Sequence, residues 1–163
     1  MIQIRLSQLP DLDRLMEIFD YARNFMASVG NGNQWINGYP GRELIAREIN
    51  AHHCYVCEDE ERKIIGTFCF VPSPDPFYTV IEDGAWLNDE PYYVIHRIAS
   101  DGSRKGIGKF CIDWCTRQYP NLRADTHQDN VIMQKLLTQS GFVRCGVVYV
   151  ANGTARIAYQ KIP

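Results

Sequence analysis

The spacing of hydrophobic residues predicts a strand followed by a helix at the start of the chain. Residues 2–6 (IQIRL) alternate between apolar and polar positions, as in a half-buried strand. Pro10 is a favourable first residue for a helix, and five apolar residues after it fall on one helical stripe: Leu12, Leu15, Met16, Phe19 and Met26. A second, shorter helix is predicted where Leu44, Ile45 and Ile49 share a face.

The segment between these helices, residues 28–41 (SVGNGNQWINGYPG), is rich in glycine and contains aromatic residues. It is longer than most connections, and long loops often cover binding sites. Two hypotheses follow for this segment. It is either a lid over a substrate or a surface loop whose Trp35 packs back into the core.

Strand patterns dominate the middle of the chain. Residues 54–58 and 63–71 are joined by the charged turn DEER, which predicts an antiparallel hairpin. After the proline-rich stretch PSPDP, residues 77–82 and 92–99 are predicted to continue the sheet.

The last third of the chain alternates helices and strands. A helix is predicted over residues 106–117, from the spacing of its apolar residues, and a strand over residues 122–127. Asp129 or Asn130 caps a further helix, which Gly141 ends. Two strands, 144–150 and 154–161, flank Ala-Asn-Gly and predict a closing hairpin. This order of elements predicts an α+β fold, with helices packed against a mixed sheet.

Length and composition fit one globular domain over residues 1–163, with 45% hydrophobic and 22% charged residues. No apolar run approaches the roughly 18 residues that a membrane span needs, so we expect no membrane association. The first dozen residues carry no signal-peptide core, so we expect a cytoplasmic location. The net charge is −2 and the basic residues are scattered, which argues against a nucleic-acid-binding surface.

Six cysteines are present, and all lie within apolar runs, where they are expected as reduced, buried residues. Cys54 and Cys57 form a CxxC next to His52 and His53, which suggests a zinc site. No second ligand pair completes four ligands, and positions i and i+3 of a strand point to opposite faces. We therefore expect no metal.

The turn after the strand 92–99 has the sequence DGSRKGIG, and a predicted helix begins where its glycines end. Glycines allow backbone N–H groups to converge on an anion, and a helix N-terminus adds positive potential. Arg104, Lys105 and Lys109 add full charges. The turn matches neither a P-loop nor a dinucleotide fingerprint. Taken alone, it is typical of an ordinary tight turn with solvated basic residues, and a phosphate cradle is the alternative.

The surrounding order of elements adds a resemblance. The strand HRIAS, the loop RKGIG, a helix, the strand RADTH, Asn130, a helix ending in SGF and a closing hairpin together resemble the GNAT superfamily of acetyl-CoA-dependent N-acetyltransferases. The resemblance covers essentially the whole chain. It implies a mixed, mostly antiparallel central sheet with about four helices packed on both faces, and acetyl-CoA as the cofactor.

The resemblance also implies the cofactor-binding residues. The pyrophosphate would be held at the glycine turn, by Arg104, Lys105, Gly106, Ile107, Gly108 and Lys109. Backbone groups of Ile98 and Ser100 would pair with the pantetheine arm, which Asn130 would also contact. Two positions depart from the family pattern. Ser103 stands where Arg or Gln is usual, and Leu137 stands where many members have a tyrosine that protonates the leaving thiolate.

Transfer to an amine requires a base, because an alkylamine with a pKa near 10.4 is mostly protonated at neutral pH. His96 is the first candidate, since histidine titrates near pH 6.5 and this residue lies on the strand leading to the glycine turn. A hydrogen-bonded core histidine is an equally good interpretation. Asp125 and His127 share a face of their strand, with Arg123 alongside, and Asp125 could hold the amine or orient a base. The alternative is a solvated strand edge or a salt bridge to Arg123.

Other candidate roles are less specific. Tyr149 is a possible proton donor in place of the missing tyrosine, or simply a packed aromatic residue. A backbone N–H near Ile98, in a bulged strand, would stabilise the oxyanion. Aromatic and acidic residues in loops would suit a cationic amine, or serve only packing. The candidates for substrate binding are Trp35, Tyr39, Glu82, Asp83 and Trp86, together with His127.

The leading hypothesis is therefore an N-acetyltransferase that acts on a small-molecule or peptide amine, with a homodimer possible. A non-catalytic acetyl-CoA sensor of the same fold is the second hypothesis, because Leu137 replaces the usual tyrosine. A nucleotide-phosphate enzyme that uses the same glycine turn is the third.

Overall fold

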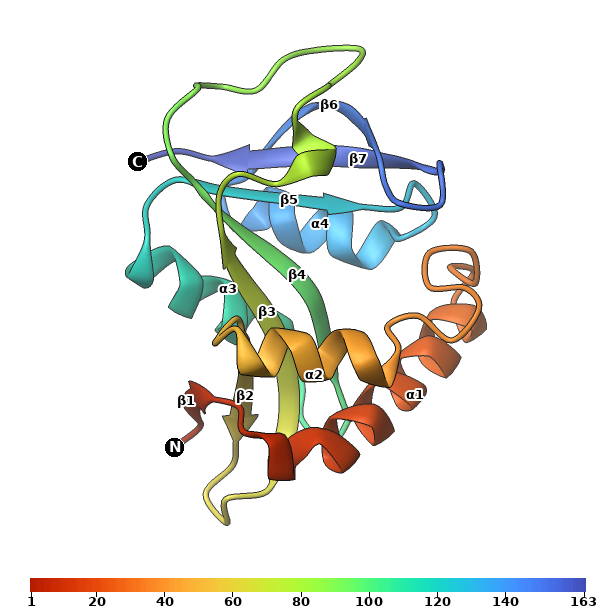
Figure 1. The fold of residues 1–163 in the computed structure, drawn as a ribbon, viewed down its shortest axis with the longest axis vertical. Helices are drawn as coiled ribbons and strands as arrows, with labels where there is room; N and C mark the ends of the chain where they lie inside the picture. The colour runs from red at the N-terminus through yellow and green to blue at the C-terminus, as the bar shows by residue number, and fades with distance from the viewer.

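A computed structural model describes residues 1–163, which form a single seven-stranded sheet flanked by helices (Figure 1). The strand order is β1-β2-β3-β4-β5-β7-β6. Every neighbouring pair is antiparallel except β4 and β5, which are parallel. The strands are β1 (Gln3–Leu6), β2 (Cys54–Glu58), β3 (Ile64–Pro72), β4 (Tyr93–Ser100), β5 (Leu122–Thr126), β6 (Val143–Tyr149) and β7 (Ala155–Lys161).

Four α-helices cover the two faces of the sheet. They are α1 (Leu12–Ser28), α2 (Arg42–Asn50), α3 (Ile107–Gln118) and α4 (Val131–Gln139). The core under α1 and α2 includes Phe19, Ile45 and Cys54, whereas the core under α3 and α4 includes Cys57 and Ile112. The predicted α+β architecture is confirmed. None of the helices combines the length and the apolar composition that a membrane crossing requires.

Cys54 and Cys57 pack into these two different cores, as the strand spacing predicted. All six cysteines are buried free thiols. No group of three or more His, Cys, Asp or Glu side chains is placed to hold a metal ion.

The predicted strand over residues 77–82 is wrong. Residues Pro76–Tyr78 form a short 3-10 helix, η2, in which the backbone N–H of Phe77 donates to the Asp75 side chain. Tyr78 anchors this turn, because it is only 3% exposed and its ring lies 5.0 Å from that of Trp86. Glu82 makes only an isolated bridge to Val147. The apolar residues of this segment anchor a loop to the sheet, so their alternation does not indicate a strand.

The two parallel strands β4 and β5 pair over only two positions, Tyr93 with Leu122 and Val94 with Arg123. Beyond these positions the strands separate. β4 also contains a bulge, because Thr67 pairs with Ala99 and Cys69 with His96, which leaves two residues opposite one. The sheet therefore opens in its middle, on the side where the glycine turn follows β4.

The bulge places Arg97 in a left-handed conformation, with φ at +55°. Such a conformation is uncommon for a residue other than glycine, and it re-aims the side chains around it. The predicted bulge near Ile98 is thus present.

The glycine turn is ordered by its first residue. The Asp101 carboxylate accepts hydrogen bonds from the backbone N–H of Ser103 at 2.9 Å and from Nη2 of Arg14 at 2.7 Å. Gly106 then precedes α3 with φ at +83°, a conformation that glycine adopts at little cost. The turn therefore places the N-terminus of α3 beside the open middle of the sheet.

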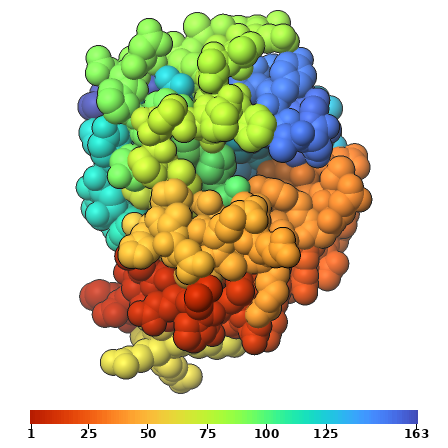
Figure 2. Space-filling model, in the orientation of Figure 1, coloured from red at the N-terminus to blue at the C-terminus, as the bar shows by residue number.

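Three segments meet over this opening: the loop 28–41, the segment 73–92 and the β6–β7 turn. Figure 2 shows them on one face, as orange, green and blue surfaces that adjoin one another.

Candidate active site

Two cavities adjoin each other at the place where β4 and β5 separate. The first has a volume of about 630 Å³ and the second about 570 Å³. Both are lined by Ile98 and Met133, and also by Met26 and Asn130. The two cavities therefore share a wall at the bulge of β4 and at the start of α4, and together they cross the opening in the sheet.

The second cavity runs from the bulge to the glycine turn. Its lining includes Ser100, Gly106, Gly108 and Lys109. A Cβ atom added at Gly106 would meet nothing within 4 Å, whereas one at Gly108 would lie 3.0 Å from the Leu136 side chain. This arrangement combines open backbone, a helix N-terminus and a lysine, which is the chemistry that phosphate groups require.

Six of the nine predicted cofactor-binding residues line the cavities: Ile98, Ser100, Gly106, Gly108, Lys109 and Asn130. The side chains of Arg104, Lys105 and Ile107 do not line either one. Arg104 makes hydrogen bonds of 3.2 and 2.8 Å to the Glu60 carboxylate, in the β2–β3 turn, and Ile107 is buried in the core. The amino group of Lys109 lies 2.9 Å from Asp113.

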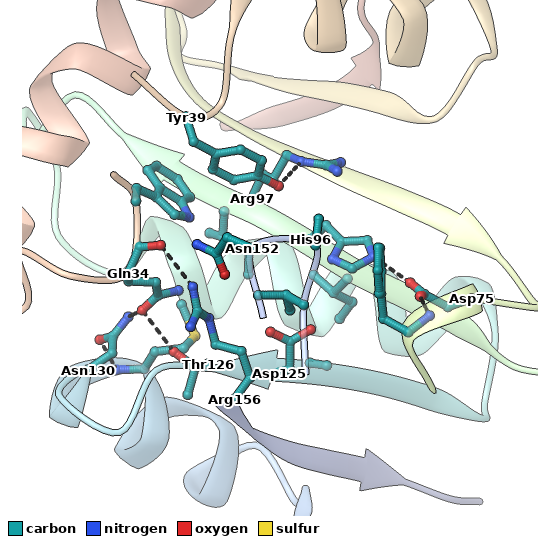
Figure 3. Close-up of a pocket in the computed structure, with 18 of the residues that line it drawn as sticks. Gln34, Tyr39, Asp75, His96, Arg97, Asp125, Thr126, Asn130, Asn152 and Arg156 are labelled. Atoms are coloured by element: carbon teal, nitrogen blue, oxygen red, sulfur yellow. Dashed lines mark hydrogen bonds and ion pairs between the residues drawn. The ribbon is translucent and has the colours of Figure 1, made fainter. Parts of the chain in front are cut away.

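The first cavity carries a histidine and a carboxylate in contact (Figure 3). His96, half-buried on β4, places its Nε2 atom 3.1 Å from Oδ2 of Asp75, in the loop before η2. Burial would raise the pKa of Asp75, but the hydrogen bond and the charge of His96 outweigh it and lower that pKa below its ordinary value. The ionised carboxylate accepts a hydrogen bond at one ring nitrogen and so holds the imidazole ring of His96 in one orientation.

A second carboxylate faces the same cavity from β5. The Tyr78 hydroxyl donates a hydrogen bond of 2.6 Å to Oδ2 of Asp125. Burial, together with the charge of Asp125, raises the pKa of Tyr78 well above its ordinary value, so this hydroxyl stays protonated and acts as a donor. The salt bridge from Arg123 to Asp125, one of the alternatives left open by the sequence, is not formed, because Arg123 stacks between Trp86 and Tyr92, at 4.0 and 3.9 Å from the ring centres.

The loop 28–41 forms another wall of the first cavity, through Trp35 and Tyr39. Trp35 packs edge-on against Phe19, with 5.8 Å between ring centres, and Tyr39 receives a hydrogen bond of 2.8 Å from Nε of Arg97. The two sequence hypotheses for this loop are therefore compatible, since Trp35 packs onto the core and the loop also borders a cavity.

Gln34 ties the loop to the far side of the opening, as Figure 3 shows. Its side-chain oxygen accepts hydrogen bonds from Asn130 at 2.9 Å and from Thr126 at 3.3 Å. Asn130 also caps α4, because its side-chain oxygen accepts from the backbone N–H of Met133 at 3.0 Å. The amide nitrogen and the amide oxygen of Asn130 thus both form hydrogen bonds within the protein.

Several predicted residues are not brought to the cavities. Tyr149 donates to Glu82 at 3.1 Å on the surface, and the Trp86 indole donates to the backbone of Tyr78 at 2.9 Å. His127 accepts a hydrogen bond from the backbone of Asp129. The predicted residues of this group line neither cavity: Tyr149, Glu82, Asp83, Trp86 and His127. Tyr78, which was not predicted, lines the first cavity. Leu137, in contrast, does line the first cavity, so the position of the usual tyrosine faces the site without a hydroxyl.

The residues of the first cavity that the sequence interpretation missed include Asp75, Tyr78, Arg97 and Arg156. Asp75 lies in a proline-rich stretch that resembles a linker, and Arg156 occupies a polar position of an alternating strand. The positive φ of Arg97 leaves no mark in the sequence. Of these four, only Tyr78 had a usable signal, because a large aromatic residue tends to be buried even when it lies in a loop.

Comparison with known proteins places this site in a family. The family model described as "Acetyltransferase (GNAT) family" matches residues 17–142. A GNAT family acetyltransferase from Streptococcus agalactiae is 30% identical, with a TM-score of 0.90, and the match covers 99% of this chain and 95% of that one. A GNAT family acetyltransferase from Listeria monocytogenes is 21% identical, with a TM-score of 0.73, over 98% of this chain and 94% of that one.

A ribosomal-protein-S5-alanine acetyltransferase from Vibrio fischeri shares the fold at 21% identity, with a TM-score of 0.60, over 99% of this chain and 92% of that one. No curated protein matches the chain. The family model alone spans well over half of the sequence, and the most similar of these three structures covers nearly all of it. The protein therefore belongs to the GNAT family of acetyltransferases.

Proposed function

We propose that this protein, as one domain over residues 1–163, transfers the acetyl group of acetyl-CoA to a primary amine of a small molecule or peptide. The observation that carries this proposal is the pairing of His96 with Asp75 in a cavity that adjoins the glycine-turn cavity at Ile98. A base therefore lies on one side of the bulge and a phosphate-type site on the other, as acyl transfer from a large phosphorylated donor requires.

The chain offers a fitting place for the donor. Gly106, Gly108 and Lys109, at the N-terminus of α3, would hold the pyrophosphate in the second cavity. Backbone groups of Ile98 and Ser100 would bind the pantetheine arm as an added strand, since β4 lacks a partner beyond Val94 on its β5 side. When bound there, acetyl-CoA supplies an activated thioester carbonyl.

His96 acts as the general base. The amine nitrogen attacks the thioester carbonyl carbon, its proton passes to His96 and the carbon–sulfur bond breaks. Asp75 holds the imidazole ring in place and stabilises the imidazolium that forms. The backbone N–H of Ile98, in the bulge, would donate a hydrogen bond to the carbonyl oxygen as it gains charge.

The leaving thiolate has no tyrosine to protonate it, because Leu137 occupies that position. A thiol has a pKa near 8.5, so its thiolate is an adequate leaving group without a side-chain donor. Tyr149 would have to leave its bond with Glu82 and move to reach the cavity. We therefore assign the proton donor role to solvent.

Leu137 also keeps the sensor hypothesis open, in which the protein binds acetyl-CoA without turnover. Release of free CoA thiol distinguishes the two functions. We expect thiol release that depends on an added amine, measured with a thiol reagent over a panel of small amines, amino acids and peptides. Binding of acetyl-CoA without thiol release from any acceptor would support the sensor. A cytoplasmic location and a homodimer stay predictions.

A further inference from the structure

Arg156, on β7, is a buried arginine that forms no ion pair with a protein carboxylate. The residue is 6% exposed and lines the first cavity. Its hydrogen bonds run to neutral acceptors only: Oγ1 of Thr154 at 2.8 Å, the backbone oxygen of Ala155 at 3.1 Å and the backbone oxygen of Gln34 at 2.9 Å. Because buried charges in proteins are normally paired, this guanidinium lacks the partner that its burial calls for.

The nearest acidic residue on the sheet is Asp125, and it does not fill this role. Asp125 pairs with Ala158 across β5 and β7, and Arg156 lies two residues before Ala158, so both charged side chains project from the same face. Asp125 is instead bonded to the Tyr78 hydroxyl. The carboxylate of Asp125 and the guanidinium of Arg156 thus face one cavity as diagonal neighbours on the sheet, and they form no ion pair.

The guanidinium of Arg156 has N–H donors that no protein acceptor uses. Arginine carries five N–H groups, and the three hydrogen bonds above leave Nε–H and one Nη2–H without a protein acceptor. The three bonds also hold the side chain in one orientation, so a ligand would meet a preorganised site. Burial lowers the pKa of Arg156, and the charge of Asp125 opposes that shift.

The charged groups are arranged in order across the cavity. In Figure 3, His96 and Asp75 lie toward one side, Gln34, Asn130 and Arg156 toward the other, and Asp125 between them. A cationic amine is therefore attracted to the middle of the cavity, next to the proposed base. A negatively charged group of the same ligand is attracted to Arg156.

We propose that the amine acceptor is a free amino acid or a close analogue, whose carboxylate is bound by Arg156 while its amine lies between Asp125 and His96. This inference rests on the proposed acetyltransferase function and narrows its acceptor class. A lysine side chain within a protein, or a protein N-terminus, carries no free carboxylate on the carbon atom that bears the amine. Arg156 is thus a specificity-determining residue.

Matched acceptors test the proposal. Each of the common amino acids is compared with its carboxamide, by the initial rate of thiol release from acetyl-CoA at subsaturating acceptor. We expect the best amino acid to exceed its amide by about 100-fold in kcat/KM, because the amide leaves a buried charge unpaired. The amide contains the more readily deprotonated amine, so a preference for the acid cannot come from amine reactivity. Equal rates, or faster reaction of the amides, would overturn the proposal while leaving the acetyltransferase function intact.

Variants separate recognition from structure. In R156Q the ratio of acid to amide should fall to about threefold or less, and R156K should retain part of the preference. A purely structural arginine would lower both rates together, and that outcome would also overturn the proposal. Arg144, exposed on β6, provides the control variant R144Q, which should keep the wild-type ratio.

Binding offers a second readout. Calorimetric titration of the CoA-loaded protein with the best amino acid should show binding that R156Q weakens and R144Q does not. Urea unfolding of each variant checks that it is folded. If no acceptor of any kind releases thiol and no amino acid binds, both the function and this inference fail.

Discussion

The Nε2 atom of His96 lies 3.1 Å from Oδ2 of Asp75, although the two residues come from different kinds of element. His96 is part of the bulged strand β4, whereas Asp75 belongs to a proline-rich loop that η2 fixes against the sheet. The contact joins a titratable ring, at the opening of the sheet, to a carboxylate that can stabilise its charge. It is the feature that turns a binding cavity into a candidate site for proton transfer.

Replacing His96 with alanine should lower kcat/KM by about 10²- to 10⁴-fold at pH 7. The loss should shrink as pH rises toward the pKa of the acceptor amine, because a growing fraction of that amine is already neutral. Rates of thiol release from pH 6.5 to 9.5 measure this. A loss of the same size at every pH would remove His96 from the role of base.

Two further variants serve as comparisons for His96→Ala. Asp75→Asn keeps the shape of the side chain and removes its charge, so it should reduce the rate less than His96→Ala. His52 is exposed, away from both cavities, and has φ at +62°. Asparagine tolerates that conformation, so His52→Asn should behave as wild type.

Replacing Gly106 with valine should weaken acetyl-CoA binding by at least about tenfold, because a β-branched residue is strained at φ +83° and projects into open space at the cradle. Gly153, with φ at +78° and no atom within 4 Å of an added Cβ, is equally strained by valine but lies in the β6–β7 turn. Calorimetric titration should give Gly153→Val near-normal affinity. If both variants bound acetyl-CoA equally weakly, backbone strain alone would explain the loss of affinity.

Replacing Tyr78 with phenylalanine should destabilise the protein by about 1–3 kcal/mol at neutral pH, because Asp125 loses a short hydrogen bond to its carboxylate. Urea unfolding measures the change. Unaltered stability would mean that solvent replaces the hydroxyl at no cost.

Tyr78 should also contribute to alkaline unfolding. Its pKa is raised in the folded state, so its contribution to stability is complete below the unfolded-state pKa of about 10 and is lost as pH rises above that value. The free energy of unfolding of Tyr78→Phe should therefore fall less steeply above pH 10 than that of the wild type. Parallel slopes would contradict the assigned shift.

Replacing Arg123 with lysine should cost about 1–2 kcal/mol, because a planar guanidinium stacks between Trp86 and Tyr92 and an ammonium group does not. The segment 73–92, which carries Asp75, should loosen as a result, and the KM for the acceptor should rise. Arg117→Lys, at the exposed end of α3, is the matched control for urea unfolding. A loss of stability equal to that of the control would rule out the stacking contribution.

The sequence predicted most of the fold, because periodicity reports which side of an element is buried. The stripe of Leu15 and Phe19 defined α1, and the Ala-Asn-Gly turn defined the closing hairpin. The same reasoning failed at residues 77–82, where Tyr78 is buried by a loop that folds over the sheet. Periodicity cannot distinguish a strand from a loop whose apolar residues anchor it.

The site was predictable only where a local pattern marks it. Gly106 and Gly108 lie shortly after a strand, the first just before α3 and the second in its first turn, so a role in anion binding was open to inference from the sequence. Asp75 and Arg156 acquire meaning only through the tertiary structure, because their partners lie 21 and 122 residues away, at His96 and Gln34. Long-range contacts of this kind leave no spacing in a single sequence.

Calorimetric titration with acetyl-CoA, beside ATP, tests the central claim most directly. The account predicts micromolar binding of acetyl-CoA, which Gly106→Val abolishes or greatly weakens, and no binding of ATP. Absence of acetyl-CoA binding, or equal binding of ATP, would contradict the assignment of the glycine turn and of the cavity that adjoins it.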